Sequence, residues 1–113
     1  MKIDITLEEV FNKVWERAKI PYKSMDNGRC VYRNPDGSKN HCFVGVCIPD
    51  ELYDPIMDNG GSIYNNKEVK SLFDSNLHAP LKELQRIHDF ESPNMWPVEL
   101  RLFAKGHNLS IPE

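Results

Sequence analysis

The chain has 113 residues and a mass of 13.1 kDa, so we expect a single domain over residues 1–113 with one modest core. Its net charge of −3 at pH 7 argues against non-specific binding to nucleic acid, which needs a densely basic surface. No apolar run approaches the ~20 residues of a membrane-spanning helix, so we expect no membrane partner. Three cysteines without CxxC spacing are typical of a reducing cytosol.

Capping signals predict a first helix that begins directly after Thr6. The sequence Thr6-Leu7-Glu8-Glu9 has the form of a capping box, in which Thr6 and Glu9 bond to each other's backbone N–H groups. Apolar residues then recur at helical spacing: Leu7, Val10, Phe11, Val14, Trp15 and Ala18. The helix must end before Pro21, and a polar loop follows over residues 21–28.

Residues 29–48 predict a β-hairpin. Asn34-Pro35-Asp36-Gly37 suits a type I turn followed by a glycine in the left-handed conformation. This register places Cys30 opposite Cys42. The residues expected on the inward face are Cys30, Tyr32, Cys42, Val44, Val46 and Ile48, and those expected on the outward face are Val31, Arg33, Lys39, His41 and Phe43.

The rest of the chain predicts short helices. Pro49 favours a helical segment that ends near Asn59, and a weaker pattern covers residues 66–74. Two further helices are marked by apolar stripes, Leu77, Leu81, Leu84 and His88 or Ile87 in one, Trp96, Leu100, Phe103 and Ala104 in the other. The last helix is expected to end at Gly106. The predicted fold is a small α+β domain with an N-terminal helix, one β-hairpin and three to four short helices, and the hairpin's edges leave room for a homo-oligomer.

The predicted pair of Cys30 and Cys42 leaves three interpretations open. Two small buried hydrophobic side chains come first, because free cysteine is among the most buried residue types. A redox-labile bridge comes second, and a metal site third. A metal would need a fourth ligand, and His41 is expected on the opposite face. We therefore assign no metal, no cofactor and no catalytic residue.

His88 and Asp89 form a second candidate. Adjacent residues on a helix point about 100° apart, so Asp89 is not expected to orient His88. His88 continues the apolar stripe and is interpreted as a core histidine with one hydrogen-bonded nitrogen. Asp89 is interpreted as a brace for a neighbouring loop.

The outward face of the hairpin forms a third candidate. Arg33 and Lys39 are expected opposite each other, which is unfavourable unless solvent or an anion separates them. Solvent is the simpler interpretation, and a phosphate or carboxylate ligand is the sharper one. The candidate ligand-binding residues are Tyr32, Arg33, His41, His88 and Asp89, with Tyr32 reaching only the rim of such a site.

A set of short motifs runs through residues 28–50 and 84–100. They are Gly28-Arg29-Cys30-x-Tyr32-Arg33, Asp36-Gly37, Cys42, Gly45, Ile48-Pro49-Asp50-Glu51, Leu84-Gln85, His88-Asp89 and Trp96-Pro97. This pattern resembles a family of small, largely uncharacterised proteins encoded by bacteriophages and prophages. The chain departs from it at Val46, where the family more often has a cysteine, and at Phe43, where it usually has a small residue. The resemblance implies a phage origin and action in the cytoplasm of the bacterial host, and it transfers no catalytic residue.

Two functions of different classes follow from the sequence. The first is a phage-type accessory binding protein that inhibits a host factor, such as a defence protein, or sequesters a small anionic or nucleotide ligand. The alternative is a small thiol- or metal-dependent hydrolase that uses Cys42 or Cys30 with His88. The hydrolase requires a solvent-accessible thiol with a lowered pKa.

Overall fold

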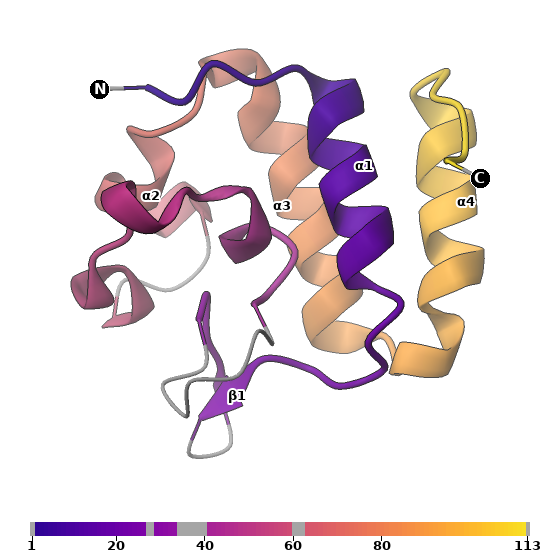
Figure 1. Ribbon diagram of the computed structural model, residues 1–113, viewed down its shortest axis with the longest axis horizontal. Helices are drawn as coiled ribbons and strands as arrows, with labels where there is room; N and C mark the ends of the chain where they lie inside the picture. The colour runs from indigo at the N-terminus through magenta and orange to yellow at the C-terminus, as the bar shows by residue number, and fades with distance from the viewer. Residues whose placement is uncertain (1, 27–28, 34–40, 60–62, 113) are drawn as a thin grey trace.

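A computed structural model describes residues 2–26, 29–33, 41–59 and 63–112, and the chain is mostly helical. Three long helices, α1 (Leu7–Arg17), α3 (Ser75–Phe90) and α4 (Trp96–Gly106), run beside one another in Figure 1. Helix α4 packs against both α1 and α3. The chain between α1 and α3 lies beside these helices and forms a series of shorter elements (Figure 1).

The shorter elements are mostly single turns of 3-10 helix. They are η1 (Gly45–Cys47), η2 (Asp50–Leu52), η3 (Pro55–Asn59), η4 (Ile63–Asn65), the α-helix α2 (Lys67–Lys70) and η5 (Pro93–Met95), which leads into α4. Two strands of two residues each, β1 (Met25–Asp26) and β2 (Arg29–Cys30), pair antiparallel, with Met25 opposite Cys30. These are the only strands in the part of the chain that the structure describes.

The sequence signals for the long helices are confirmed. Helix α1 has the capping box between Thr6 and Glu9, and it buries Val10, Phe11 and Val14. The buried faces of the other two helices contain the predicted stripes: Leu77, Leu81, Leu84, Gln85, Ile87 and His88 in α3, and Trp96, Leu100, Phe103 and Ala104 in α4. Helix α4 ends at Gly106 as expected, although the residue in the left-handed conformation is Asn108, with φ of 58°.

The predicted β-hairpin over residues 29–48 is wrong, and the fold is therefore not α+β. Residues 43–47 coil into a turn and η1 instead of extending as a second strand. A short apolar run such as Phe43–Ile48 fits a buried strand and a buried helical turn equally well, so its periodicity does not decide between them. The predicted turn at Asn34–Gly37, and Lys39, lie outside the described residues.

The predicted division of this segment into two faces also fails. Phe43 and Val31, expected on the outward face, are 0% and 4% exposed, and Cys47 is 2% exposed. A helical turn does not alternate its side chains between two faces, so Cys42, Phe43 and Val44 can all be buried together. Cys30, Cys42 and Cys47 are free thiols.

A close approach between Gly45 and Tyr32 fixes how this turn packs. The Cys42 N–H donates to the Tyr32 carbonyl at 3.1 Å, and the turn then brings Gly45 against the same carbonyl. A Cβ atom at position 45 would lie 2.0 Å from the Tyr32 oxygen, far inside van der Waals contact. Only glycine allows the two backbones to pass at this distance.

We predict that Gly45→Ala lowers the free energy of unfolding by about 3 kcal/mol or more, because the two backbone segments must separate. The matched control is Gly106→Ala, since a Cβ there has no neighbour within 4 Å and alanine favours the helix. Urea denaturation of both variants measures the difference. A loss below about 0.5 kcal/mol in Gly45→Ala would contradict the close approach.

Candidate functional site

The structure divides the predicted ligand-binding residues between two sites. Tyr32 and Asp89 line one cavity, with the His88 ring buried behind Asp89. Arg33 and His41 line a separate groove. Tyr32 and Arg33 are neighbours in the chain, so the segment that carries them contributes to both sites.

The first site is a groove of about 630 Å³ between α1, His41 and the segment from Val46 to Glu51, named here the Arg17–Arg33 groove. Its charged lining residues are Lys13, Glu16, Arg17, Lys19, Arg33, Asp50 and Glu51. Its apolar lining residues are Ile20, Val46, Ile48 and Pro49. Basic side chains outnumber carboxylates in this groove although the whole chain is acidic.

Arg17 is buried in the wall of this groove, with 4% of its surface exposed. Its guanidinium donates to the carbonyl oxygens of Ile20 at 3.0 Å, Tyr22 at 2.7 Å and His41. It also lies 5.7 Å from the centre of the Trp96 ring. No carboxylate of the described residues pairs with it, and burial lowers its pKa from the usual value. Arg17 therefore places beside the groove a cation that is hydrogen-bonded to carbonyls and has no carboxylate partner among the described residues.

Arg33 is the second cation of the groove. One of its terminal nitrogens pairs with Asp50 at 2.7 Å, and the other donates to the Ile48 carbonyl at 2.8 Å. Its guanidinium carbon lies 4.5 Å from the centre of the Tyr53 ring. The Nε atom is buried and has no hydrogen-bond partner in the described chain. Arg33 is thus held in place and keeps one unused donor.

The second site is a smaller cavity of about 260 Å³, named here the Asp58–Asp89 cavity. Its polar or sulfur-bearing lining residues are Cys30, Tyr32, Cys42, Asp58, Gln85 and Asp89. Val31 and Phe90 complete the wall, and Phe90 is 79% exposed. The cavity lies between the C-terminal end of α3, strand β2 and its continuation, and η3.

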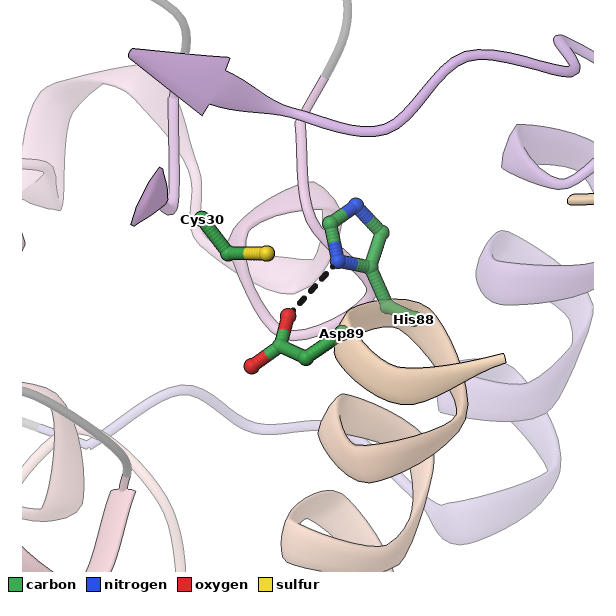
Figure 2. Close-up of side chains that lie close together, drawn as sticks. All are labelled: Cys30, His88 and Asp89. Carbon is green, nitrogen blue, oxygen red and sulfur yellow. Dashed lines mark hydrogen bonds and ion pairs between the residues drawn. The ribbon is translucent and has the colours of Figure 1, made fainter. Parts of the chain in front are cut away.

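Hydrogen bonds to both ring nitrogens fix the tautomer of His88. The Ser24 N–H donates to Nε2 at 3.1 Å, so Nε2 carries no proton. The proton of the neutral ring is therefore on Nδ1, which donates to the Asp89 carboxylate at 2.8 Å (Figure 2). Burial lowers the pKa of His88, and the bond to Asp89 opposes this effect only in part. The expectation that Asp89 does not orient His88 is wrong, because both residues lie in the last turn of α3, where their side chains bend toward each other.

The Cys30 thiol lies against the same carboxylate (Figure 2). Burial and the negative charge of Asp89 raise the pKa of Cys30 to about 12, and Lys23 opposes them only weakly. Burial also raises the pKa of Cys42 above the usual range and that of Cys47 to about 12. The described thiols are therefore protonated at neutral pH, and none has the lowered pKa of a nucleophile.

Cys30, His88 and Asp89 are close enough to suggest a metal site, since their potential ligand atoms lie within 4.8 Å of one another. The hydrogen bonds do not fit this role. A neutral imidazole that binds a metal through Nδ1 carries its proton on Nε2, and that proton would meet the Ser24 N–H. The three side chains are arranged as a hydrogen-bonded chain, and we assign no metal to them.

Asp58 forms the opposite wall of the cavity. One carboxylate oxygen accepts from the Tyr32 N–H and the other accepts from the Tyr53 hydroxyl. Asp58 and Asp89 both raise the pKa of Tyr32, for which burial is the largest cause, while a hydrogen bond from Gln85 opposes the rise. Both carboxylates therefore face the same small space.

Several lining residues were missed by the sequence analysis. Arg17 follows Val10 and Val14 at helical spacing, so its place on the buried stripe of α1 was a readable signal of burial. Gln85 belongs to the buried face of α3 in the same way. Asp58 carried no such signal, because η3 is an irregular segment whose position depends on tertiary packing.

Comparison with known proteins gives no match: no protein-family model, curated protein or solved structure is similar to this chain. The resemblance to phage proteins stays a prediction. Among the helices of the described residues, none has the length and apolar character needed to cross a membrane. The function is therefore inferred from the two sites.

We predict that the protein loses stability as the pH falls from about 6.5 to 5, because the unfolded chain protonates His88 while the folded chain resists protonation. Above the unfolded pKa the ring is neutral in both states, so this contribution to the free energy of unfolding is complete there. The slope added by His88 is at most about 1.4 kcal/mol per pH unit. Urea denaturation across this range measures it, with His88→Gln as the comparison.

An equal slope in His88→Gln would contradict this assignment. The tautomer has its own test in the wild-type protein, which does not depend on the variant's folding. Nitrogen-15 NMR of the imidazole ring is expected to show a protonated Nδ1 and an unprotonated Nε2 at pH 7.

We predict that iodoacetamide modifies Cys30 about a thousand-fold more slowly at pH 8 than it modifies an unfolded cysteine, because the raised pKa leaves little thiolate. Asp89→Asn removes the negative charge beside the thiol and replaces one carboxylate oxygen by an NH2 donor, so we expect the rate to rise several-fold. Mass spectrometry of the modified peptide gives both rates. Cys47 serves as the internal control, because Asp89 makes no contribution to its pKa. A native Cys30 that reacts at the unfolded rate would contradict the geometry.

Proposed function

We propose that the protein is a small binding protein and that the Arg17–Arg33 groove takes an anionic ligand carrying a phosphate or carboxylate. The observation that carries the proposal is the buried Arg17 guanidinium, whose hydrogen-bond partners among the described residues are all carbonyl oxygens. A buried cation without a counter-charge is costly, and an anion in the groove would lower that cost. Lys13, on the same helix, adds to the positive charge that Arg17 and Arg33 place at the groove.

The remaining groups support an organic anion in preference to a bare ion. A volume of about 630 Å³ lies within the range of small-molecule sites, which is roughly 300–1,000 Å³. The apolar wall of Ile20, Val46 and Ile48 suits the uncharged part of such a ligand. Arg33, with a buried Nε that has no partner in the described chain, offers a fixed donor.

The biological setting is part of the proposal. The motifs of residues 28–50 and 84–100 support a phage accessory protein that acts in the cytoplasm of a bacterial host, where it sequesters an anionic metabolite or inhibits a host protein. The hydrolase alternative has less support. It requires a reactive thiolate, whereas the pKa values of Cys30 and Cys42 are raised and the Nε2 atom of His88 is occupied by Ser24.

We predict saturable binding of pyrophosphate or a nucleoside diphosphate to the native protein by isothermal titration calorimetry. Lys13→Gln is expected to weaken binding about three- to ten-fold, and Arg33→Gln by more, because Arg33 is rigid and partly buried. Lys105→Gln, on the exposed part of α4, removes the same charge elsewhere and is expected to change the affinity less than two-fold, or about 0.4 kcal/mol.

Equal weakening by Lys13→Gln and Lys105→Gln would mean that only overall charge matters, and the groove would not be the site. If neither pyrophosphate nor the nucleoside diphosphate binds saturably, the proposal is also contradicted. Thermal unfolding of each variant, measured in parallel, separates lost binding from lost folding.

A further inference from the structure

The Asp58–Asp89 cavity holds two carboxylates whose hydrogen-bond partners are uncharged. Asp58 accepts from a backbone N–H and a tyrosine hydroxyl. Asp89 accepts from the neutral His88 ring and lies against the protonated Cys30 thiol. Each donor satisfies part of a carboxylate without neutralising its charge, so two negative charges remain at one small space.

No basic side chain of the described residues pairs with either carboxylate. The Lys23 ammonium donates to the backbone carbonyl of Asp89 at 2.8 Å, and Lys23 does not line the cavity. Near Asp58, the guanidinium of Arg33 is engaged by Asp50 and the Ile48 carbonyl. The described part of the cavity wall therefore supplies no counter-charge to the two carboxylates.

The remaining walls suit a cation with a short apolar stem. Phe90 and Tyr32 are aromatic, and aromatic ring faces attract ammonium and guanidinium groups. The volume of about 260 Å³ is below that of ordinary drug-sized sites, so it selects a small group. A second depression, lined by residues of α3, shares Gln85, Asp89 and Phe90 with the cavity, which gives a stem a path outward.

We propose that the Asp58–Asp89 cavity binds the ammonium or guanidinium end of an alkyl chain, held between the two carboxylates and the ring of Phe90. A guanidinium has a planar set of donors that matches carboxylate oxygens, and an ammonium has three donors. This site is independent of the Arg17–Arg33 groove and takes ligands of the opposite charge. The same chemistry is found in free alkylamines and in the lysine and arginine side chains of proteins.

The test uses n-butylguanidinium and its uncharged isostere n-butylurea, titrated into the native protein by calorimetry and by NMR. We expect n-butylguanidinium to bind at least about ten-fold more tightly than n-butylurea. Asp58→Asn and Asp89→Asn preserve shape and remove one charge each, so each is expected to weaken binding about ten-fold. Glu68→Gln removes a charge from the exposed side of α2 and is expected to change the affinity less than two-fold, or about 0.4 kcal/mol.

The wild-type protein gives a readout that survives if a variant fails to fold. Binding at this site is expected to shift the NMR signals of the Gln85 side-chain amide and of the Phe90 ring. Equal affinities for n-butylguanidinium and n-butylurea would overturn the proposal, and so would a titration that leaves the signals of Gln85 and Phe90 unchanged. It would also be overturned if Glu68→Gln weakened binding as much as Asp58→Asn and Asp89→Asn.

A blocked arginine, Nα-acetylarginine methylamide, distinguishes the two sources of the cation. If it binds as tightly as n-butylguanidinium, the cavity accepts an arginine side chain from a protein partner. If it binds at least ten-fold more weakly, or about 1.4 kcal/mol, the cavity selects free alkyl cations. Both results support the ammonium or guanidinium class.

Discussion

The buried ring of His88 joins parts of the chain that are more than sixty residues apart in sequence. It accepts the Ser24 N–H, donates to Asp89 and packs on Trp96, with ring centres 5.4 Å apart. Phe43 meets it edge-on at 5.2 Å. The His88 ring accepts the Ser24 N–H just before β1 and also orients the Asp89 carboxylate of the cavity. The position of the cavity therefore depends on this ring. A histidine with both nitrogens bonded serves here as a structural connector.

Opposite charges are separated across a short stretch of backbone. Tyr32 contributes to the cavity that holds two carboxylates, and its neighbour Arg33 contributes to the groove that holds a buried cation. Both residues lie in a bend shortly after β2, and this one segment supplies a wall to each site. The modest net charge of −3 is therefore the sum of local regions of opposite sign, positive at the Arg17–Arg33 groove and negative at the Asp58–Asp89 cavity.

The sequence predicted the parts of the fold that local signals determine. It failed where contacts between residues distant in the sequence determine the backbone conformation. Helix α1 follows from its capping box and stripe, and α4 follows from its four buried residues. The hairpin was misplaced because the apolar run Phe43–Ile48 has no decisive period, and because the approach of Gly45 to Tyr32 is a tertiary contact. The antiparallel pairing of Met25 with Cys30 differs from the predicted loop over residues 21–28. For the sites, sequence named Tyr32, Arg33, His41, His88 and Asp89, but it could not sort them into two places, since that depends on how η1 and η3 pack.

Trp96 has a consequence for how this protein can be studied. Its indole is fully buried, donates to the Ile87 carbonyl at 3.2 Å, and contacts both the guanidinium of Arg17 and the imidazole of His88. One of these neighbours belongs to the groove and the other stands behind the cavity. The chain thus contains a natural fluorophore that contacts one residue of the groove and the ring behind the cavity, and in a Trp15→Phe background its emission is expected to respond to occupancy of either site.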